Sequence, residues 1–157
     1  MYLKNAWYVG ALSREVSRDP FQRFMLDEPL VFYRTELGEP VVLEDRCCHR
    51  FAPLSSGWLE GDNIVCGYHG FTYNPKGACT RVPGLDKAPK KACVQSYPVV
   101  EKWGWIWVWM GDVALADKNK IPDFHYLDDP AWAGKDALLH IDSAYNLVYE
   151  NLLDLTH

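Results

Sequence analysis

Short apolar runs separated by turn residues dominate the first two thirds of the chain. The runs at 29–34 and 40–44 are rich in strand-favouring residues, and the glycine-containing turn between them predicts an antiparallel hairpin. The segments 63–66 and 70–73 form a second pair, and the turn residues 74–77 follow it. The pattern therefore predicts a small antiparallel β domain with many turns.

Four tryptophans alternate with smaller apolar residues over 103–110. A period of two places all four indole rings on one face of a strand and the smaller side chains on the other face. An aromatic-binding surface is one interpretation of this row. A strand buried on both faces explains the pattern better, so we predict a core strand.

After this segment the sequence becomes polar and proline-containing, which indicates a linker, and a helical pattern follows. Asp142 or Ser143 can serve as the N-cap of a helix that runs to His157. Asn151, Asp154 and His157 are spaced three apart, so they are expected to lie in a row along one side of this helix. Taken alone, such a row is typical of a polar helix surface near a C-terminus.

Composition and charge narrow the classes of function. The 157 residues are 48% hydrophobic and 24% charged, as in an ordinary globular protein. The formal net charge of −5 argues against nucleic acid as a partner, because phosphate binding needs a basic patch, and it is compatible with a basic redox partner. No apolar run is long enough to span a bilayer or to act as a targeting segment, so we expect a cytoplasmic protein without membrane attachment.

Five cysteines, an odd number, are mixed with histidines along the chain, which favours metal binding over a disulfide framework. Cys47 and His49 form one closely spaced pair, Cys66 and His69 form another, and residues 50–65 separate the pairs. Two loops that each offer a thiolate and an imidazole fit a Rieske [2Fe–2S] cluster. In that cluster two cysteines bind one iron and two histidines bind the other.

A zinc site with two cysteines and two histidines uses the same ligand types and is the alternative. Zinc fingers usually place both cysteines on one arm and both histidines on the other, whereas each arm here carries one of each. Gly57, Gly67 and Gly70 would also let backbone N–H groups approach the cluster sulfides. These features favour the Rieske cluster.

The remaining cysteines, Cys48, Cys79 and Cys93, have no evident partner in the sequence. We expect each of them to be a small buried apolar residue. Cys48 adjoins Cys47 and could replace it as a ligand if the loop shifted. The sequence predicts Cys47 as the ligand.

The segments 46–54 and 66–71 resemble the oxygenase branch of the Rieske proteins. Respiratory-chain Rieske proteins carry an extra cysteine beside each ligand pair, and these two cysteines form a bracing disulfide. Here Cys48 lies between its two ligands and Gly67-Tyr68 occupies the second position, so no such bridge is expected. Gly70-Phe71 supplies no hydroxyl to a cluster sulfide. The resemblance therefore implies a cluster of lower potential, as in oxygenases.

The resemblance extends to 151–157, which is similar to the motif that begins the mononuclear iron site of Rieske non-haem iron oxygenases. It implies that His157 is the first ligand of a mononuclear Fe(II), and that the other ligands follow in a longer polypeptide. Asp154 would bridge electron transfer between His69 of one subunit and His157 of the next, and Asn151 would support the iron ligands without touching the metal.

The fold implied is mainly β. A Rieske [2Fe–2S] antiparallel β domain spans 1–116. The linker and the truncated start (a strand and a helix) of an α+β helix-grip catalytic domain span 117–157.

The resemblance is to oxygenase components of the vanillate O-demethylase and toluenesulfonate methyl-monooxygenase type. It implies a terminal monooxygenase that O-demethylates or methyl-hydroxylates a substituted aromatic acid with O₂. Electrons would come from NAD(P)H through a flavin and iron–sulfur reductase, and the oxygenase would form a homotrimer. The alternative is a Rieske ferredoxin that only carries electrons, and a zinc-bound structural domain is a third interpretation.

Overall fold

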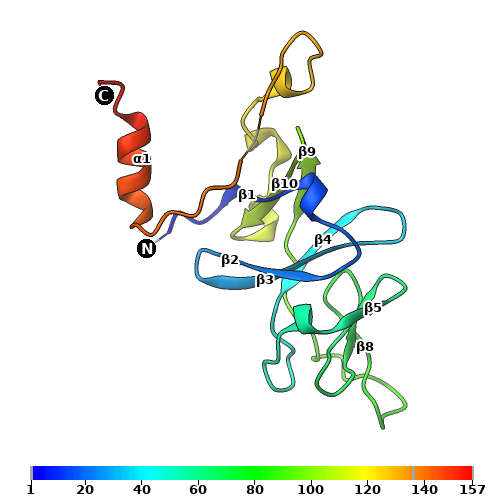
Figure 1. The fold of residues 1–157 in the computed structure, drawn as a ribbon. Helices are drawn as coiled ribbons and strands as arrows, with labels where there is room; N and C mark the ends of the chain where they lie inside the picture. Colours follow the sequence, from blue (N-terminus) through cyan, green and yellow to red (C-terminus); the bar gives the residue numbers. More distant parts are fainter. Residues whose placement is uncertain (1, 136, 157) are drawn as a thin grey trace.

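The computed structural model describes residues 2–135 and 137–156, which form three antiparallel sheets, several short 3₁₀ turns and one α-helix (Figure 1). Sheet A has the strand order β1-β10-β9, with bounds Ala6–Leu12, Trp105–Met110 and Val99–Lys102. Sheet B has the order β2-β3-β4, with bounds Phe21–Met25, Glu28–Arg34 and Pro40–Glu44. Sheet C has the order β5-β6-β7-β8, with bounds Trp58–Glu60, Asn63–Val65, Thr72–Tyr73 and Cys79–Arg81. The 3₁₀ turns are η1 Ser13–Glu15, η2 Leu54–Ser56, η3 Val113–Leu115, η4 Lys118–Lys120 and η5 His125–Leu127.

Both predicted hairpins are confirmed. Strands β3 and β4 pair from Leu30↔Glu44 to Arg34↔Pro40, and β6 pairs with β7 through Ile64↔Tyr73 and Val65↔Thr72. The turn after β7 closes through the Gly77 N–H, which donates to the Asn74 carbonyl at 2.8 Å. The predicted mainly β architecture is therefore the observed one.

The tryptophan-rich segment forms β10, and its residues 106–110 are buried on both faces as predicted. The strand begins at Trp105 and not at Trp103. Trp103 (φ 56°) and Gly104 (φ 75°) are the two residues of the β9–β10 turn, flanked by the pair Trp105↔Lys102. Two positive φ angles give the type I′ turn that matches strand twist, so Trp103 leaves the row of tryptophans on the strand.

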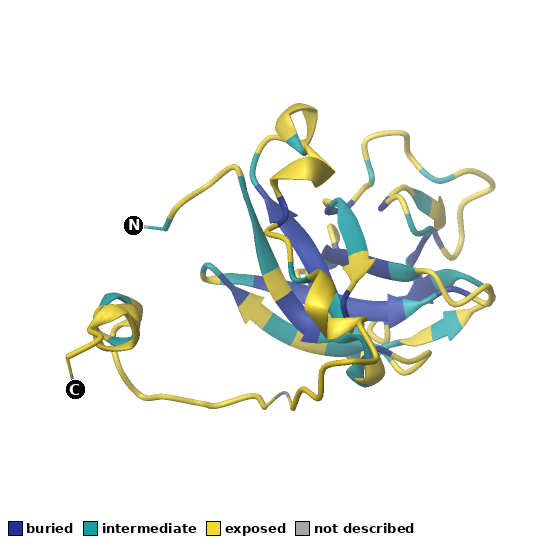
Figure 2. Ribbon diagram, turned by 90° about the horizontal axis from the view of Figure 1, so that it is seen from above, coloured by how far each residue is buried: buried dark blue, intermediate teal, exposed yellow. Residues whose placement is uncertain are grey.

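Two apolar cores separate the three sheets. Strand β3 supplies both, because Leu30 and Phe32 pack toward sheet A while Val31 and Tyr33 pack toward sheet C. Figure 2 shows these strands as the buried centre of the molecule. A smaller cluster covers the outer face of sheet A, where Phe124 packs with residues Trp103, Trp107 and Ile121.

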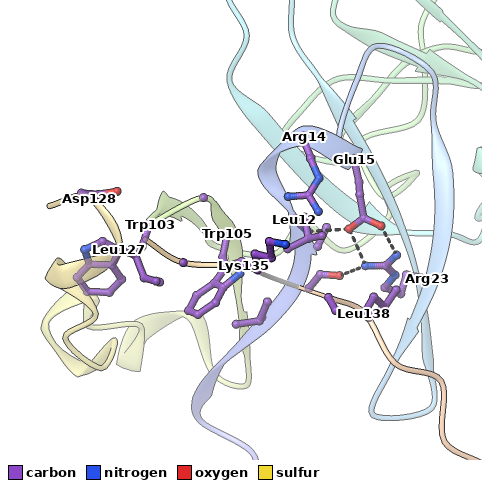
Figure 3. Close-up of a pocket in the computed structure, with 16 residues that line it drawn as sticks. Leu12, Arg14, Glu15, Arg23, Trp103, Trp105, Leu127, Asp128, Lys135 and Leu138 are labelled. Carbon is purple, nitrogen blue, oxygen red and sulfur yellow. Dashed lines mark hydrogen bonds and ion pairs between the residues drawn. The ribbon is translucent and has the colours of Figure 1, made fainter. Parts of the chain in front are cut away.

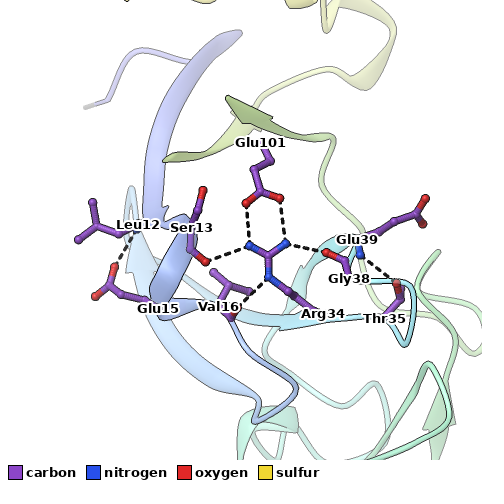
Figure 4. A network of polar contacts seen from close by, with 9 residues as sticks. All are labelled: Leu12, Ser13, Glu15, Val16, Arg34, Thr35, Gly38, Glu39 and Glu101. Atoms are coloured by element: carbon purple, nitrogen blue, oxygen red, sulfur yellow. Dashed lines mark hydrogen bonds and ion pairs between the residues drawn. The ribbon is translucent and has the colours of Figure 1, made fainter. Parts of the chain in front are cut away.

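A half-buried arginine joins sheets A and B (Figure 4). The Arg34 guanidinium on β3 donates two parallel hydrogen bonds to the Glu101 carboxylate on β9, at 2.7 and 2.8 Å. It also donates to the carbonyls of Ser13, Val16 and Gly38 at 2.6–2.9 Å. This forked pairing lowers the pKa of Glu101 below its usual value and fixes the two sheets against each other.

The single α-helix of the described residues, α1, spans Tyr145–Leu153 and lies beside the N-terminus, apart from the sheets (Figures 1 and 2). Its N-cap is Ala144, so the predicted cap at Asp142 or Ser143 is wrong. The Asp142 carboxylate instead contacts the imidazole of His140 at 3.1 Å, and the Ser143 hydroxyl bonds to the Ala144 carbonyl at 3.5 Å.

The helix also ends earlier than predicted. Leu153 is its last residue, and Asp154 is the C-cap with ψ 101°. The Asp154 carboxylate accepts hydrogen bonds from the backbone N–H and the hydroxyl of Thr156, which stabilises a turn in place of a further helical turn.

No strand follows β10 among the described residues, so the strand expected after the linker is not found there. Residues 137–141 are extended and exposed and have no strand to pair with. No helix in 2–135 or 137–156 is both long and apolar enough to cross a bilayer.

Candidate metal centre

The two cysteine–histidine pairs lie on loops with matching backbone closure. In the first loop the Cys47 N–H donates to the Ala52 carbonyl, and the Cys47 carbonyl accepts from the Phe51 N–H, each at 2.9 Å. In the second loop the Cys66 N–H donates to the Phe71 carbonyl at 2.8 Å, and its carbonyl accepts from the Gly70 N–H at 2.9 Å. Each cysteine thus bonds to the residues four and five positions after it.

The fifth residue of each loop adopts a left-handed conformation, with φ 56° at Phe51 and 73° at Gly70. Glycine adopts this conformation at little cost, whereas phenylalanine is strained by it. The first loop therefore has the same backbone hydrogen bonds as the second, although Phe51 is unfavourable in this conformation. These shared hydrogen bonds make the two loops structural counterparts, although their histidines differ in spacing.

The loops segregate thiols from imidazoles. Cys47 and Cys66 are each only 2% exposed, and the Cys66 thiol contacts the Cys47 thiol within the core between sheets B and C. His49 and His69 are exposed, and their ring centroids lie 4.8 Å apart. Burial raises the pKa of the Cys66 thiol, and a bound cation would favour its thiolate form.

This arrangement fits a two-iron cluster, because two sulfur ligands lie together inside and two nitrogen ligands lie together at the surface. Within the described residues, no three histidine, cysteine or acidic side chains are grouped so that they could hold a single metal ion together. Aromatic side chains orient the imidazoles: Phe71 stacks on His49 with centroids 4.9 Å apart, and Tyr68 lies 3.8 Å from His69.

Cys47 and Cys48 occupy different environments. Cys47 is buried beside Cys66, whereas Cys48 is exposed. Of the three other cysteines, Cys79 is half-buried and Cys93 is exposed, so the expectation that all three are buried is wrong. Cys48 and Cys93 lie in loops and not in a strand face, which is why neither is covered.

A buried tyrosine, which the sequence analysis missed, contacts the first loop. The Tyr73 hydroxyl lies 3.1 Å from Cys47 Sγ and 3.2 Å from Cys48 Sγ, and it accepts the Cys48 N–H at 3.2 Å. Burial raises the pKa of Tyr73 well above its usual value, so the hydroxyl keeps its proton and donates it to sulfur. In the sequence, the only sign of this role was the position of Tyr73, four residues after His69 on the strand that leads away from the second loop.

Asp45 is a second positioning residue that the sequence did not indicate. It is 1% exposed, and its carboxylate accepts from the Ser55 N–H and hydroxyl and from the Gln22 amide at 2.6–2.7 Å. Its own N–H donates to the Pro29 carbonyl at 2.8 Å. Because Asp45 precedes Cys47 and Ser55 follows the loop, these bonds hold both ends of the first loop.

Two of the predicted glycines are explained by the approach of one loop to the other. A Cβ on Gly57 would lie 1.8 Å from the Val65 carbonyl oxygen, and one on Gly67 would lie 2.8 Å from the Ser56 carbonyl oxygen. Any side chain at these positions would push the two loops apart.

The other predicted site residues lie away from these loops. Asn151 is on α1 and Asp154 caps it, both exposed, whereas His157 lies outside the described residues. A cavity of about 630 Å³ opens between η1, the β9–β10 turn and the segment from Leu127 to Leu138 (Figure 3). Its wall includes the Arg23–Glu15 ion pair at 3.3 Å and none of the cysteines or histidines.

Comparison with known proteins identifies the family. The family described as the Rieske [2Fe-2S] domain matches residues 6–98. The chain is 46% identical to the iron-sulfur subunit of the toluene-4-sulfonate monooxygenase system of Comamonas testosteroni, over 100% of this chain and 46% of that protein. It is 45% identical to the oxygenase component of dicamba O-demethylase of Stenotrophomonas maltophilia, over 99% of this chain and 46% of that protein.

The structural comparison agrees. The crystal structure of dicamba monooxygenase with non-heme iron and dicamba superimposes with a TM-score of 0.94 and 44% sequence identity, covering 99% of this chain and 48% of that one. The chain spans about half the length of the curated relatives it matches. Family membership implies a [2Fe–2S] cluster, and the residues present fit one. The chain therefore belongs to the Rieske [2Fe–2S] domain family, and its relatives named here are oxygenase components.

Proposed function

We propose that this chain is the cluster-bearing part of the oxygenase component of a Rieske non-haem iron monooxygenase. The observation that carries the proposal is the pair of matched loops, with two thiols buried together and two imidazoles exposed together. Similarity to oxygenase components over nearly the whole chain favours this role over that of a separate electron carrier.

In this proposal Cys47 and Cys66 hold one iron of the cluster, and His49 and His69 hold the other. The bound cluster accepts and releases one electron at a time. The chain's own residues set its surroundings: the Tyr73 hydroxyl lies within hydrogen-bond distance of the Cys47 and Cys48 sulfurs and would donate to Cys47 once that sulfur is an iron-bound thiolate, and Asp45 fixes the loop. The exposed imidazoles provide the side of the cluster from which an electron can reach another protein group.

We further propose the division of the chain into a Rieske domain at 1–116 and the start of a catalytic domain at 117–157. In the full polypeptide His157 would be the first ligand of the mononuclear Fe(II). Asp154 would accept an N–H from that imidazole and one from the cluster histidine of a neighbouring subunit, and Asn151 would support this arrangement. A homotrimer in the cytoplasm would provide the neighbouring subunit.

The reaction would insert one atom of O₂ into a methyl C–H bond of a substituted aromatic acid. The second oxygen atom leaves as water, with two electrons supplied by NAD(P)H through a flavin and iron–sulfur reductase, and two protons. A hydroxylated methoxy group is a hemiacetal that breaks down to a phenol and formaldehyde. The names of the relatives suggest toluene-4-sulfonate, dicamba and vanillate as the substrates to test first.

The test uses the protein at its natural length, loaded with iron and supplied with a reductase and NADH. We expect one of the three acids to yield a hydroxymethyl product, or a phenol with an equal amount of formaldehyde. An Asp154→Ala variant should keep a reducible cluster and lose turnover. A cluster that is reduced yet yields no oxygenated product from any substituted aromatic acid would instead favour the electron carrier.

A further inference from the structure

The charges of the chain are unevenly distributed. Residues 46–91, which include both cysteine–histidine loops and sheet C, contain seven basic and three acidic residues. The rest of the chain contains nine basic and eighteen acidic residues, so the net charge is +4 in the first part and −9 in the second. The overall charge of −5 therefore hides a basic end around the candidate cluster.

Three lysines of this basic end lie in one loop. Lys87, Lys90 and Lys91, which follow β8, are exposed, and none of them forms an ion pair with a described residue. Arg81, by contrast, is neutralised by Glu60 at 3.0 Å. The three lysines, termed the lysine loop below, outweigh the neighbouring exposed Asp86 and so present a net positive charge to solvent.

The lysine loop is attached beside the second cysteine–histidine loop. At its start, a Cβ on Gly70 would lie only 3.1 Å from Pro83 Cγ. At its end, the Cys79 N–H donates to the Ala92 carbonyl at 3.0 Å, and Cys93 forms a bridge with Ala78. Figure 1 shows this segment next to β5 and β8, at the end of the molecule opposite sheet A.

Exposed apolar side chains occur on both cysteine–histidine loops and just before the lysine loop. Phe51 is 73% exposed, Tyr68 65% and Leu85 56%. A small apolar centre with a charged margin is typical of transient electron-transfer interfaces, which bury little surface and depend on charge to steer the encounter.

We propose that the lysine loop docks the acidic face of the protein that delivers electrons to the cluster. This inference rests on the proposed function, because it assigns the surface that an electron-donor protein contacts. It also reverses the expectation from net charge alone, since the partner's complementary face is acidic and not basic. Docking here brings the donor beside the second cysteine–histidine loop without occupying the buried thiol side.

The test compares two variants with the same change in net charge, prepared at natural length with the cluster loaded. One is Lys90→Glu/Lys91→Glu in the lysine loop, and the matched control is Lys118→Glu/Lys135→Glu, at exposed positions on the sheet A side. A reduced, acidic plant-type [2Fe–2S] ferredoxin serves as the donor probe. Stopped-flow absorbance gives the second-order rate of cluster reduction, and surface plasmon resonance gives the binding of the oxidised ferredoxin.

At low ionic strength we expect the loop variant to be reduced about tenfold or more slowly and to bind the ferredoxin correspondingly weakly. The control should change less than about twofold, and the difference should vanish near 0.5 M salt, where charges are screened within a few ångströms. A Lys90→Gln/Lys91→Gln variant should give an intermediate rate.

Three results would overturn the proposal: equal losses in the loop and control variants, a loss that persists at high salt, or a change in oligomeric state of the loop variant alone. The last result, measured by light scattering, would assign the surface to a second copy of the chain. Because cluster reduction needs no aromatic substrate, a protein that forms no oxygenated product but keeps this charge dependence would refute the proposed function and leave the docking surface intact.

Discussion

Replacing Tyr73 by phenylalanine removes one hydroxyl from a buried position 3.1 Å from Cys47 Sγ. A hydrogen bond donated by this hydroxyl to an iron-bound Cys47 thiolate would stabilise the reduced cluster more than the oxidised cluster, because reduction adds a negative charge to the sulfur ligands. Hydrogen bonds to charged groups contribute about 1.5–3 kcal/mol, against about 1 kcal/mol for neutral pairs. The difference between the two oxidation states is therefore on the order of 1.4 kcal/mol, within a range of about 0.5–2 kcal/mol.

For a one-electron couple this free energy corresponds to about 59 mV. We expect Tyr73→Phe to lower the reduction potential of the cluster by about that amount while the visible spectrum of the cluster is retained. The raised pKa of Tyr73 keeps the hydroxyl protonated near neutral pH, so the shift should be the same at pH 6 and pH 8. Protein-film voltammetry or a redox titration followed by electron paramagnetic resonance measures it.

The matched control is Tyr97→Phe. Tyr97 is also buried, but its hydroxyl donates to Glu28 at 2.8 Å and contacts neither cysteine–histidine loop. A shift of equal size in both variants, or a Tyr73→Phe potential within about 10 mV of the native value, would refute the reasoning, since an effect of the hydrogen bond is expected to be about 59 mV.

Four further substitutions test the candidate centre and the junction of the sheets. Cys47→Ser should abolish the cluster and Cys48→Ser should leave it, as measured by iron and acid-labile sulfide per chain. Retained visible absorption in Cys47→Ser would contradict the ligand assignment. Asp45→Ala removes a buried carboxylate that accepts three hydrogen bonds. The free energy of unfolding, measured by heat or denaturant, should fall by about 2–4 kcal/mol, and the cluster content should fall with it. An unchanged free energy of unfolding would show that Asp45 does not hold the first loop in place. The lowered pKa of Glu101 means that its contribution to stability is present above the unfolded-state pKa and is lost as pH falls through the folded-state value. Glu101→Gln should therefore weaken the acid dependence of the free energy of unfolding measured by urea denaturation, and an unaltered pH profile would contradict this.

The hairpins were predictable because their signals are local. Apolar runs on either side of Gly38 specify β3, β4 and the turn that joins them, and apolar runs on either side of Gly70 specify β6, β7 and their connection. Trp103 was placed wrongly because its left-handed conformation depends on the pairing of β9 with β10, which no single residue signals. The helix cap was wrong for a similar reason, since Asp142 has another partner in His140.

The four candidate ligands were predictable from spacing, because closely spaced cysteine and histidine carry chemistry that few other patterns share. Tyr73 and Asp45 were not, because each acts on the first loop through contacts that form only when sheets B and C pack together. Net charge is a similarly incomplete guide to the partner. A sum over the sequence does not show that basic residues gather around the loops and acidic residues elsewhere.

The matched closure of the two loops bears on how the protein uses its cluster. Each loop is completed by its own backbone hydrogen bonds, and the loops lie in close contact at Gly57 and Gly67. These contacts restrain the loops in addition to any bonds to iron. A restrained frame has little freedom to relax when the electron count of a bound cluster changes. We therefore expect a small reorganisation energy of electron transfer, and with it a low activation barrier for electron exchange in both directions.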